Sequence, residues 1–328
     1  MSWRSAVLVV APLPGCAAEA PAAAAPELPD ERLLLLEELG PPVLSTLDPG
    51  AAGTEARFTL ASGAFAYDLD VHESGAVALA YTAPGADGGP GYDRSGIVSL
   101  QPDDTLLAVA CRDASGVWCF FPAWSPDTSR VWFVAAGVDV GSGAEHALAC
   151  VDAPGEPIRE VVPWGTEPAV SADGARVAWV AVDPDTRRRS LVLGDRDGAS
   201  PSTLVASGVM TDISQPFFSV DGEHVYFVVP TTLAVSFWER VMWERLVPSA
   251  QAHGSHDVPG DWWRVPTAGG PSEQITDLQT IQYDGRAHPD GRWFAAATRE
   301  GVVLVDLETG EATSLLEIRA VRALDWLP

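Results

Sequence analysis

In this 328-residue chain, polar side chains that could bind a ligand or catalyse a reaction recur just before a repeated turn. Four residues before the Ser or His of each turn lie Asp68, Phe121, Glu167, Gln215 and Asp284, and two residues further on lie Asp70, Arg286 and Asp325. If these carboxylates converge, they could bind a cation or the basic end of a peptide, or act as a general acid and base. Alternatively, they accept hydrogen bonds from loop backbone amides and bind nothing.

The turns belong to a repeated motif. Strong copies are Pro-Ala-Trp-Ser-Pro-Asp at 122–127, Pro-Ala-Val-Ser-Ala-Asp-Gly at 168–174 and Pro-Phe-Phe-Ser-Val-Asp-Gly at 216–222, and weaker copies lie at His72–Gly75 and His288–Gly291. The turn positions 74, 127, 173, 221 and 290 are 53, 46, 48 and 69 residues apart. The repeating unit is therefore about 46 residues long, with one insertion.

Each unit predicts two successive hairpins. An Asp-Gly turn lies between two runs rich in β-branched and aromatic residues, and Asp and Gly tolerate the positive φ that a two-residue turn requires. A second hairpin follows, as at Asp197-Gly198 after an apolar run and at Gly269-Gly270 after another. Four strands in about 46 residues are typical of a propeller blade, so we expect an all-β fold in which equivalent positions converge around a central channel.

These motifs resemble the TolB-like, WD40-like propeller repeat (the PD40 repeat), over roughly residues 60 to 328. The resemblance implies a six-bladed propeller. Leu324–Pro328 matches the first strand of a unit and then stops, so residues 32–60 are expected to supply the other three strands of a shared closing blade. We therefore predict a six-bladed β-propeller of four-stranded blades over residues 32–328. TolB itself carries an additional N-terminal α/β domain, for which residues 17–60 are too few, and a Tol-system role is not expected.

The N-terminal segment predicts export. Arg4 precedes an apolar run, and Leu13-Pro14-Gly15-Cys16 resembles a bacterial lipobox, which makes residues 1–16 an export signal, residues 17–31 an Ala/Pro-rich tether and Cys16 a lipid anchor. The protein would then lie in the periplasm or on the cell surface, anchored to the membrane only through Cys16. An ordinary secretory signal and a disordered cytosolic tail remain as alternatives.

Three cysteines lie in the predicted propeller. Cys111 and Cys119 are eight residues apart around a predicted turn and form the favoured disulfide, although connectivity with Cys150 stays open. The sequence contains no C-x-x-C pair, and we predict no structural zinc site.

The insertion at 230–261, in the fourth full repeat, offers two further candidates. Phe237 and Trp238 lie on one stripe of a predicted helix and Trp243 lies off it, so these residues either contact a partner or pack on the blade rim. His253 and His256, with carboxylates nearby, are either metal ligands or part of a solvated loop. We assign no metal and no cofactor.

The composition and the absence of certain motifs exclude or disfavour several classes of function. A net charge of −25 disfavours nucleic acid and anionic lipid surfaces as partners. The chain contains no Lys and no G-x-S-x-G elbow, which excludes a Lys Schiff base and leaves no sign of a hydrolase partner domain.

We expect a non-enzymatic binding or scaffold propeller of the cell envelope that recognises a protein, peptide or glycan at the propeller face or channel entrance, and we assign no catalytic residue. The alternative is a metal-assisted hydrolase or lyase that uses Asp68, Glu167 or Asp284 in the channel. A third hypothesis is a sensor whose specificity comes from the 230–261 insertion.

Overall fold

The computed structural model describes residues 28–38, 41–51, 53–84, 90–111, 117–126, 130–137, 143–210, 212–231, 259–317 and 321–328, without the side chains of 90–94. These residues form 24 β-strands and no helix. Accordingly, no helix in the described ranges is long and apolar enough to cross a membrane. The prediction of an all-β chain is confirmed.

Three antiparallel sheets each use four strands that are consecutive in the chain. One contains β4 (Phe65–Val71), β5 (Val77–Pro84), β6 (Pro90–Leu100) and β7 (Leu106–Ala110). The next contains β8 (Val117–Trp124), β9 (Val131–Gly137), β10 (His146–Val151) and β11 (Arg159–Pro163). The third contains β12 (Gly165–Val170), β13 (Arg176–Val182), β14 (Arg189–Asp195) and β15 (Ser202–Val205).

The following strands pair into a longer sheet. It begins with β16 (Ser214–Phe218), β17 (His224–Pro230) and β18 (Pro259–Pro266), with the short β19 (Glu273–Gln274) paired to β18. It continues with β20 (Thr280–Ala287), β21 (Trp293–Thr298), β22 (Gly301–Asp306) and β23 (Ala312–Leu316). Only two residue pairs, Pro259 with Ile281 and Gly260 with Thr280, join the two halves.

The two ends of the chain share one sheet, which we call the closing sheet. Its order is β24 (Val321–Trp326), β1 (Leu33–Glu37), β2 (Val43–Leu47) and β3 (Thr54–Thr59). Leu33 pairs with Trp326 and Leu35 pairs with Leu324. The prediction that the C-terminal strand would complete its sheet with strands from residues 32–60 is therefore confirmed.

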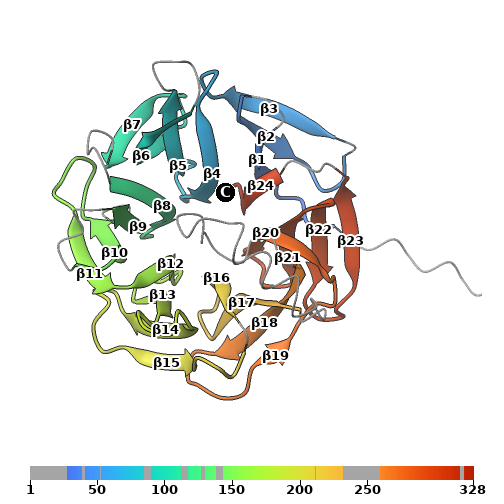
Figure 1. Ribbon diagram of the computed structural model, residues 1–328. Helices are drawn as coiled ribbons and strands as arrows, with labels where there is room; N and C mark the ends of the chain where they lie inside the picture. Colours follow the sequence, from blue (N-terminus) through green and yellow to red (C-terminus); the bar gives the residue numbers. More distant parts are fainter. Residues whose placement is uncertain are drawn as a thin grey trace, which may run out of the picture.

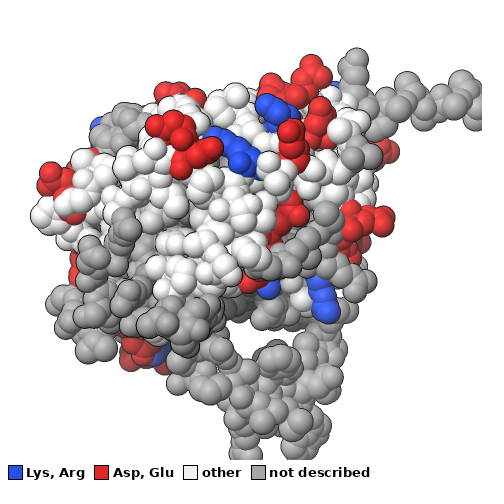
Figure 2. Space-filling model, turned by 90° about the horizontal axis from the view of Figure 1, so that it is seen from above, with Lys and Arg blue, Asp and Glu red and all other residues white. Residues whose placement is uncertain are grey.

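The sheets stand around a common axis. Figure 1 shows them in a ring that follows the chain, with β4, β8, β12, β16, β20 and β24 nearest the centre. The first strand of each unit is thus the innermost one, so equivalent positions of the units lie near a common axis, as predicted. Acidic side chains are prominent on the face of the molecule seen in Figure 2, in line with the net charge of −25.

The hydrophobic core is divided into slabs between neighbouring sheets. Trp132 and Trp179, for example, lie in one cluster between the β8–β11 and β12–β15 sheets. Phe217, Trp262 and Phe294 pack in another, with the rings of Phe217 and Phe294 stacked at 5.4 Å. These aromatic residues, apart from Trp262, lie on the strands near the axis, and all of them pack between neighbouring sheets.

The predicted hairpins form, but the prediction of a two-residue Asp-Gly turn is wrong. The Ser171 N–H donates to the Arg176 carbonyl and the Gly174 N–H donates to the Ser171 carbonyl, so four residues connect the strands. Of the Asp-Gly pair only the glycine has a positive φ, +66° at Gly174 and +68° at Gly222. At Gly222 a Cβ atom would also lie 2.6 Å from the Arg176 side chain. The predicted insertion begins and ends inside strands, because Pro230 pairs with Gly260 and Asp261 continues β18.

Candidate functional site

The predicted axial residues occupy one structural position in five innermost strands. The register of each of these strands shifts within a few residues of the predicted side chain, at Asp68, Phe121, Glu167, Gln215 and Asp284. Phe121, Glu167 and Gln215 adopt positive φ values of 51°, 52° and 53°. A β-bulge bends its strand and turns the side chain away from the ladder, and here it directs Glu167, Gln215 and Asp284 towards the neighbouring sheet.

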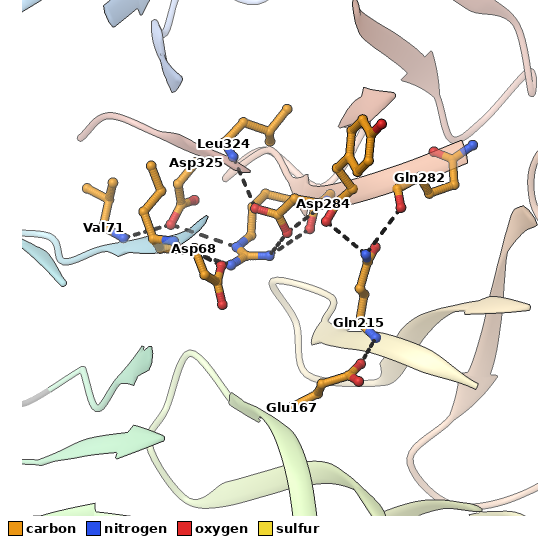
Figure 3. A network of polar contacts seen from close by, with 12 residues as sticks. Asp68, Val71, Glu167, Gln215, Gln282, Asp284, Leu324 and Asp325 are labelled. Atoms are coloured by element: carbon orange, nitrogen blue, oxygen red, sulfur yellow. Dashed lines mark hydrogen bonds and ion pairs between the residues drawn. The ribbon is translucent and has the colours of Figure 1, made fainter. Parts of the chain in front are cut away.

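Three carboxylates link successive innermost strands through backbone amides. The Leu324 N–H donates to Asp284 Oδ2 at 3.0 Å, and the Val71 N–H donates to Asp325 Oδ2 at 2.8 Å. These contacts join β20 to β24 and β24 to β4 (Figure 3). The Trp124 N–H donates to Asp70 Oδ2 at 2.7 Å and so joins β4 to β8.

Glu167 and Gln215 extend this pattern on the other side of the axis. The Gln215 N–H donates to Glu167 Oε2 at 2.6 Å, and Gln215 Nε2 donates to the Tyr283 carbonyl at 2.8 Å (Figure 3). Arg189 Nη1 lies 2.9 Å from Glu167 Oε1 and neutralises that carboxylate. The alternative interpretation, in which the polar residues satisfy backbone groups, therefore describes much of what they do. Some of these backbone partners are local, as the Leu69 N–H is for Asp68, whereas others, such as the Leu324 N–H that donates to Asp284, lie on the adjacent sheet.

One guanidinium group lies among four carboxylates at this part of the axis. Arg286 Nη1 is 2.6 Å from Asp284 Oδ1, and Arg286 Nε is 3.9 Å from Asp325 Oδ2. Arg286 Nη2 also donates to the Leu69 carbonyl at 3.2 Å. Asp68 and Asp70 of β4 complete the group through their charges. We call these five residues the axial cluster; it has formally three more negative than positive charges.

Burial and mutual repulsion change the acidity of the cluster. Burial, followed by the charge of Asp284, raises the pKa of Asp68 well above its usual range. Burial also raises the pKa of Asp70, and it raises that of Asp325 to about 7 even though Arg286 opposes the change. For Arg286, burial lowers the pKa, but the surrounding carboxylates, led by Asp284, outweigh burial and raise it. The cluster therefore retains protons near neutral pH around a permanent cation.

A cavity of about 140 Å³ opens beside the cluster. Asp70, Arg286 and Ala287 line one side of it. The other side consists of the same three motif positions from three strands, Pro122–Trp124, Pro168–Val170 and Pro216–Phe218. The cavity thus combines one carboxylate and one guanidinium group with residues from three motif copies, and most of the surface that lines it is polar. A cavity of about 150 Å³ holds a single benzene ring, so this one suits a short side chain or a chain end.

The sequence does not predict this cavity. The prolines and the residues after them are recognisable only as part of the turn motif. One feature of the sequence does point to this cavity. A proline follows directly after three of the axial positions, at Pro122, Pro168 and Pro216, and a residue so close to an axial position must also lie near the axis.

A second hollow, of about 300 Å³, lies over the turns of three sheets and is lined by Glu73, Ser125, Pro126, Asp173, Gly174 and Arg196. Its charged groups have mixed sign and include none of the predicted site residues.

Several predicted residues lie outside the described ranges. These are Cys16, Phe237, Trp238, Trp243, His253 and His256. Asp261, close to the two histidines in sequence, is buried and accepts hydrogen bonds from the Leu278 and Gln279 amides at 2.6 and 3.2 Å. Among the described residues, no three His, Cys, Asp or Glu side chains are grouped so that they could hold a metal ion.

The cysteine pairing follows the prediction. Cys111 and Cys119 form a disulfide with Cα atoms 6.3 Å apart, while Cys150 is buried as a free thiol. The disulfide joins the end of β7 to β8 and so links two neighbouring sheets. Next to it, Tyr67 and Ser95 donate to the Cys119 carbonyl at 3.1 and 3.2 Å.

Solved structures share this architecture at low sequence identity. TolB from Acinetobacter baumannii is similar over 91% of this chain and 67% of its own, with a TM-score of 0.64 and 14% identity. A putative TolB from Agrobacterium tumefaciens covers 91% and 99%, with a TM-score of 0.58 and 13% identity. A nidogen/laminin complex gives a TM-score of 0.63 at 10% identity over 89% and 97%.

An oligogalacturonate lyase from Vibrio parahaemolyticus is also similar, with a TM-score of 0.51 and 11% identity over 88% of this chain and 75% of its own. No protein-family profile and no curated protein matches the sequence. These likenesses identify a β-propeller fold and leave the function to be argued from the site.

Proposed function

We propose that this chain is an exported, non-catalytic binding propeller whose channel mouth recognises a positively charged group on a protein or peptide. The observation that carries the proposal is the pairing of the axial cluster with the cavity. Asp70 lines the cavity, and a cation bound beside it would favour the ionised form of the carboxyl groups of the cluster. The aliphatic part of an amino terminus or basic side chain can contact Pro122, Pro168 and Pro216. A neutral glycan would leave the excess negative charge uncompensated.

The proposed architecture is a six-bladed propeller with a shared closing blade. Two residue pairs alone connect β18 to β20, so the longer sheet divides naturally into two blades. Apolar clusters between neighbouring sheets support this division, since one of them lies between β17–β18 and β21–β22. The resulting ring positions each innermost strand against the axis.

Export and lipid anchoring through Cys16 are part of the proposal. The disulfide supports export, because disulfides persist in oxidising compartments such as the bacterial periplasm. Palmitate labelling of the full chain, compared with a Cys16→Ser variant, tests the anchor.

The enzymatic alternative has less support. In the described residues the candidate carboxylates accept backbone amides, as Asp284 does from Leu324 and Glu167 does from Gln215. A general acid or base needs a lone pair or proton directed at the substrate. A binding role does not need such a group, because Asp70 supplies a carboxyl group that lines the cavity.

The proposal is tested with two small probes matched in size. Saturation-transfer NMR should detect n-butylammonium bound to the protein and little binding of butyrate. Asp70→Asn should weaken the butylammonium signal several-fold, because Asp70 lines the cavity. Asp173→Asn, which removes a charge from an exposed turn, is the matched control. Equal signals from both probes, or an unchanged signal in Asp70→Asn, would show that the mouth does not select cations.

A further inference from the structure

Trp124 ends β8 at the channel mouth and carries a hydrogen-bond donor that is not used within the described part of the chain. It lines the cavity, and its backbone N–H donates to Asp70 Oδ2 at 2.7 Å, so the residue lies directly beside this carboxyl group. Its side-chain Nε1 is buried and has no hydrogen-bond acceptor among the described residues. An indole N–H can only donate, and a buried one normally has an acceptor.

A tryptophan in the equivalent position of the closing sheet shows how this donor is used elsewhere. Trp326 ends β24 as Trp124 ends β8, and each ring lies edge-on to the motif histidine that follows the preceding innermost strand. Trp326 Nε1 donates to the Arg286 carbonyl of that strand at 3.3 Å. The rings of Trp326 and His288 are 4.5 Å apart, whereas those of Trp124 and His72 are 5.8 Å apart. Trp124 therefore lies farther from its histidine and does not form the corresponding hydrogen bond.

The comparison also indicates where the Trp124 donor points. In the repeat, Arg286 holds the same position as Asp70, two residues after the bulged position. The carbonyl that Trp326 uses thus corresponds to the backbone of β4 at Asp70, a residue that lines the cavity. By this equivalence, the unused indole N–H of Trp124 faces the part of the cavity next to Asp70.

The other side chain with N–H groups at the cavity is already engaged. Arg286 Nη1 donates to Asp284 Oδ1 at 2.6 Å and to the Gly285 carbonyl at 3.0 Å. Arg286 Nη2 donates to the Leu69 carbonyl at 3.2 Å. Among the described residues that line the cavity, Trp124 is the one whose side-chain N–H lacks an acceptor. A ligand that brings an acceptor to Trp124 gains a hydrogen bond without breaking one in the protein.

We propose that Trp124 makes the channel mouth selective for the amino terminus of a peptide or protein over a basic side chain; this inference rests on the proposed recognition of a positively charged group. The α-ammonium group lies beside the Asp70 carboxyl group, and the carbonyl oxygen of the same terminal residue accepts from Trp124 Nε1. In an amino terminus, the ammonium nitrogen and the carbonyl carbon are attached to one Cα atom, which suits two protein groups that lie side by side. In a lysine or arginine side chain, the cation is far from any carbonyl group and can contact Asp70 alone.

The space around Trp124 also suits a chain that continues beyond its first residue. The hollow of about 300 Å³ is lined by Ser125 and Pro126, which follow Trp124 directly, and by Asp173 and Gly174 of the turn after β12. The cavity and this hollow therefore follow each other along the ends of β8 and β12. A peptide whose amino terminus lies in the cavity has room to leave the mouth over these two turns.

The experiment compares two isosteric probes, glycinamide and isobutylammonium, at about pH 6.5, where an α-amino group is protonated. Both carry an ammonium group on a methylene carbon, but only glycinamide has a carbonyl group. NMR titration of the intact protein should give glycinamide an affinity about three- to tenfold higher, the effect of one hydrogen bond. Trp124→Phe, which keeps an aromatic ring and removes the N–H, should abolish this preference and change the affinity for isobutylammonium much less.

Trp179→Phe is the matched control. Trp179 Nε1 is also buried without an acceptor among the described residues, but Trp179 lies in the core slab between two sheets and does not line the cavity. This variant should keep the preference for glycinamide. If Trp124→Phe does not fold, the wild type still provides a test, because the Trp124 indole N–H resonance should move downfield with glycinamide and stay in place with isobutylammonium.

The outcomes separate this inference from the proposed function. Equal affinities for the two probes, a preference that survives Trp124→Phe, or an indole resonance that responds equally to both probes would overturn the inference and leave cation recognition intact. If neither probe bound, the proposed function would fail and the inference would fail with it.

Discussion

At the scale of single residues, Arg286 carries the electrostatic balance of the axis. It is the cation that the four carboxylates of the axial cluster share, and it also donates to the Leu69 carbonyl. Removing the cation of an ion pair lowers stability more in a partly buried site than at the surface. Water can solvate the remaining carboxylate only where the pair is exposed.

We predict that Arg286→Met lowers the free energy of unfolding by about 3 to 5 kcal/mol at pH 7, because it leaves buried carboxylates without a counter-charge. Urea unfolding provides the measurement. Arg264→Met is the matched control, since Arg264 pairs with the exposed Glu273 at 2.7 Å and should cost less than about 1 kcal/mol. Similar losses in the two variants would mean that the axial cluster has little electrostatic importance.

The sequence predicts the axial residues but not what they contact. Because the repeat gives their spacing, Asp68, Glu167 and Asp284 can be placed at equivalent positions from the motif alone. The bulges cannot be predicted, because non-glycine residues such as Glu167 adopt positive φ only under tertiary constraint. Because the bulges direct these side chains, the hydrogen bonds from one sheet to the next cannot be predicted from the sequence either.

At the scale of strands and sheets, closure depends on a short segment near the beginning of the described chain. Four successive leucines of β1, Leu33 to Leu36, are fully buried and contact two different core clusters. A strand that is apolar on both faces is typical of one covered on both sides. A half-exposed strand alternates apolar and polar residues. The sequence of β1 does not alternate, because neighbouring sheets cover both of its faces.

We predict that Leu34→Ala costs about 2 to 5 kcal/mol of stability, because it leaves a cavity in a fully packed slab. Leu107→Ala, in the outer strand β7, removes a side chain that is 43% exposed and should cost far less. Thermal or urea unfolding distinguishes the two. If Leu34→Ala were no worse than Leu107→Ala, the N-terminal strands would not be integral to the fold.

The disulfide acts at the same scale, because it links β7 to β8 in neighbouring sheets. Replacing both Cys111 and Cys119 by Ser should lower stability by about 2 to 3 kcal/mol, the value expected for a short loop in the unfolded chain. Dithiothreitol should lower the melting temperature of the wild type and leave that of the double variant unchanged. A Cys150→Ser variant, which keeps the disulfide, should remain sensitive to the reductant.

At the scale of the whole molecule, the excess of negative charge opposes closure of the ring of sheets. The chain has 45 acidic and 20 basic residues, and their mutual repulsion favours expansion. Some arginines lie over aromatic rings of a neighbouring sheet, as Arg322 of β24 does over Tyr283 of β20 at 4.9 Å and Arg176 of β13 does over Phe218 of β16 at 5.7 Å. The scarce cations thus serve to hold sheets together.

We predict that raising NaCl from 0.02 to 0.3 M, values chosen to shorten the Debye length from about 20 to about 6 Å, increases stability by roughly 1 kcal/mol and the melting temperature by about 2 °C. Screening should relieve the net repulsion more than it weakens individual pairs. Differential scanning calorimetry at the two salt concentrations measures the change. A fall in the melting temperature would show that ion pairs outweigh the excess negative charge.

The fold is more predictable than the cavity for a physical reason. Turns and strands leave local signals, so the four-stranded units and the shared closing sheet follow from motif spacing and from the match of Leu324–Pro328 to the first strand of a unit. The cavity depends on how far apart the innermost strands stand, which no local pattern specifies. Its wall of Pro122, Pro168 and Pro216 becomes recognisable only when the strands are arranged around an axis.

The most direct test of the account is isothermal titration of the protein with two short Ala-rich peptides that differ only in a free or an acetylated amino terminus. The axial cluster and the adjoining cavity predict that the peptide with the free amino group binds at least about tenfold more tightly, a difference of about 1.4 kcal/mol, and that Asp70→Asn removes most of this preference. Equal affinity for the two peptides in the wild type would contradict the claim that the channel mouth recognises a positively charged group.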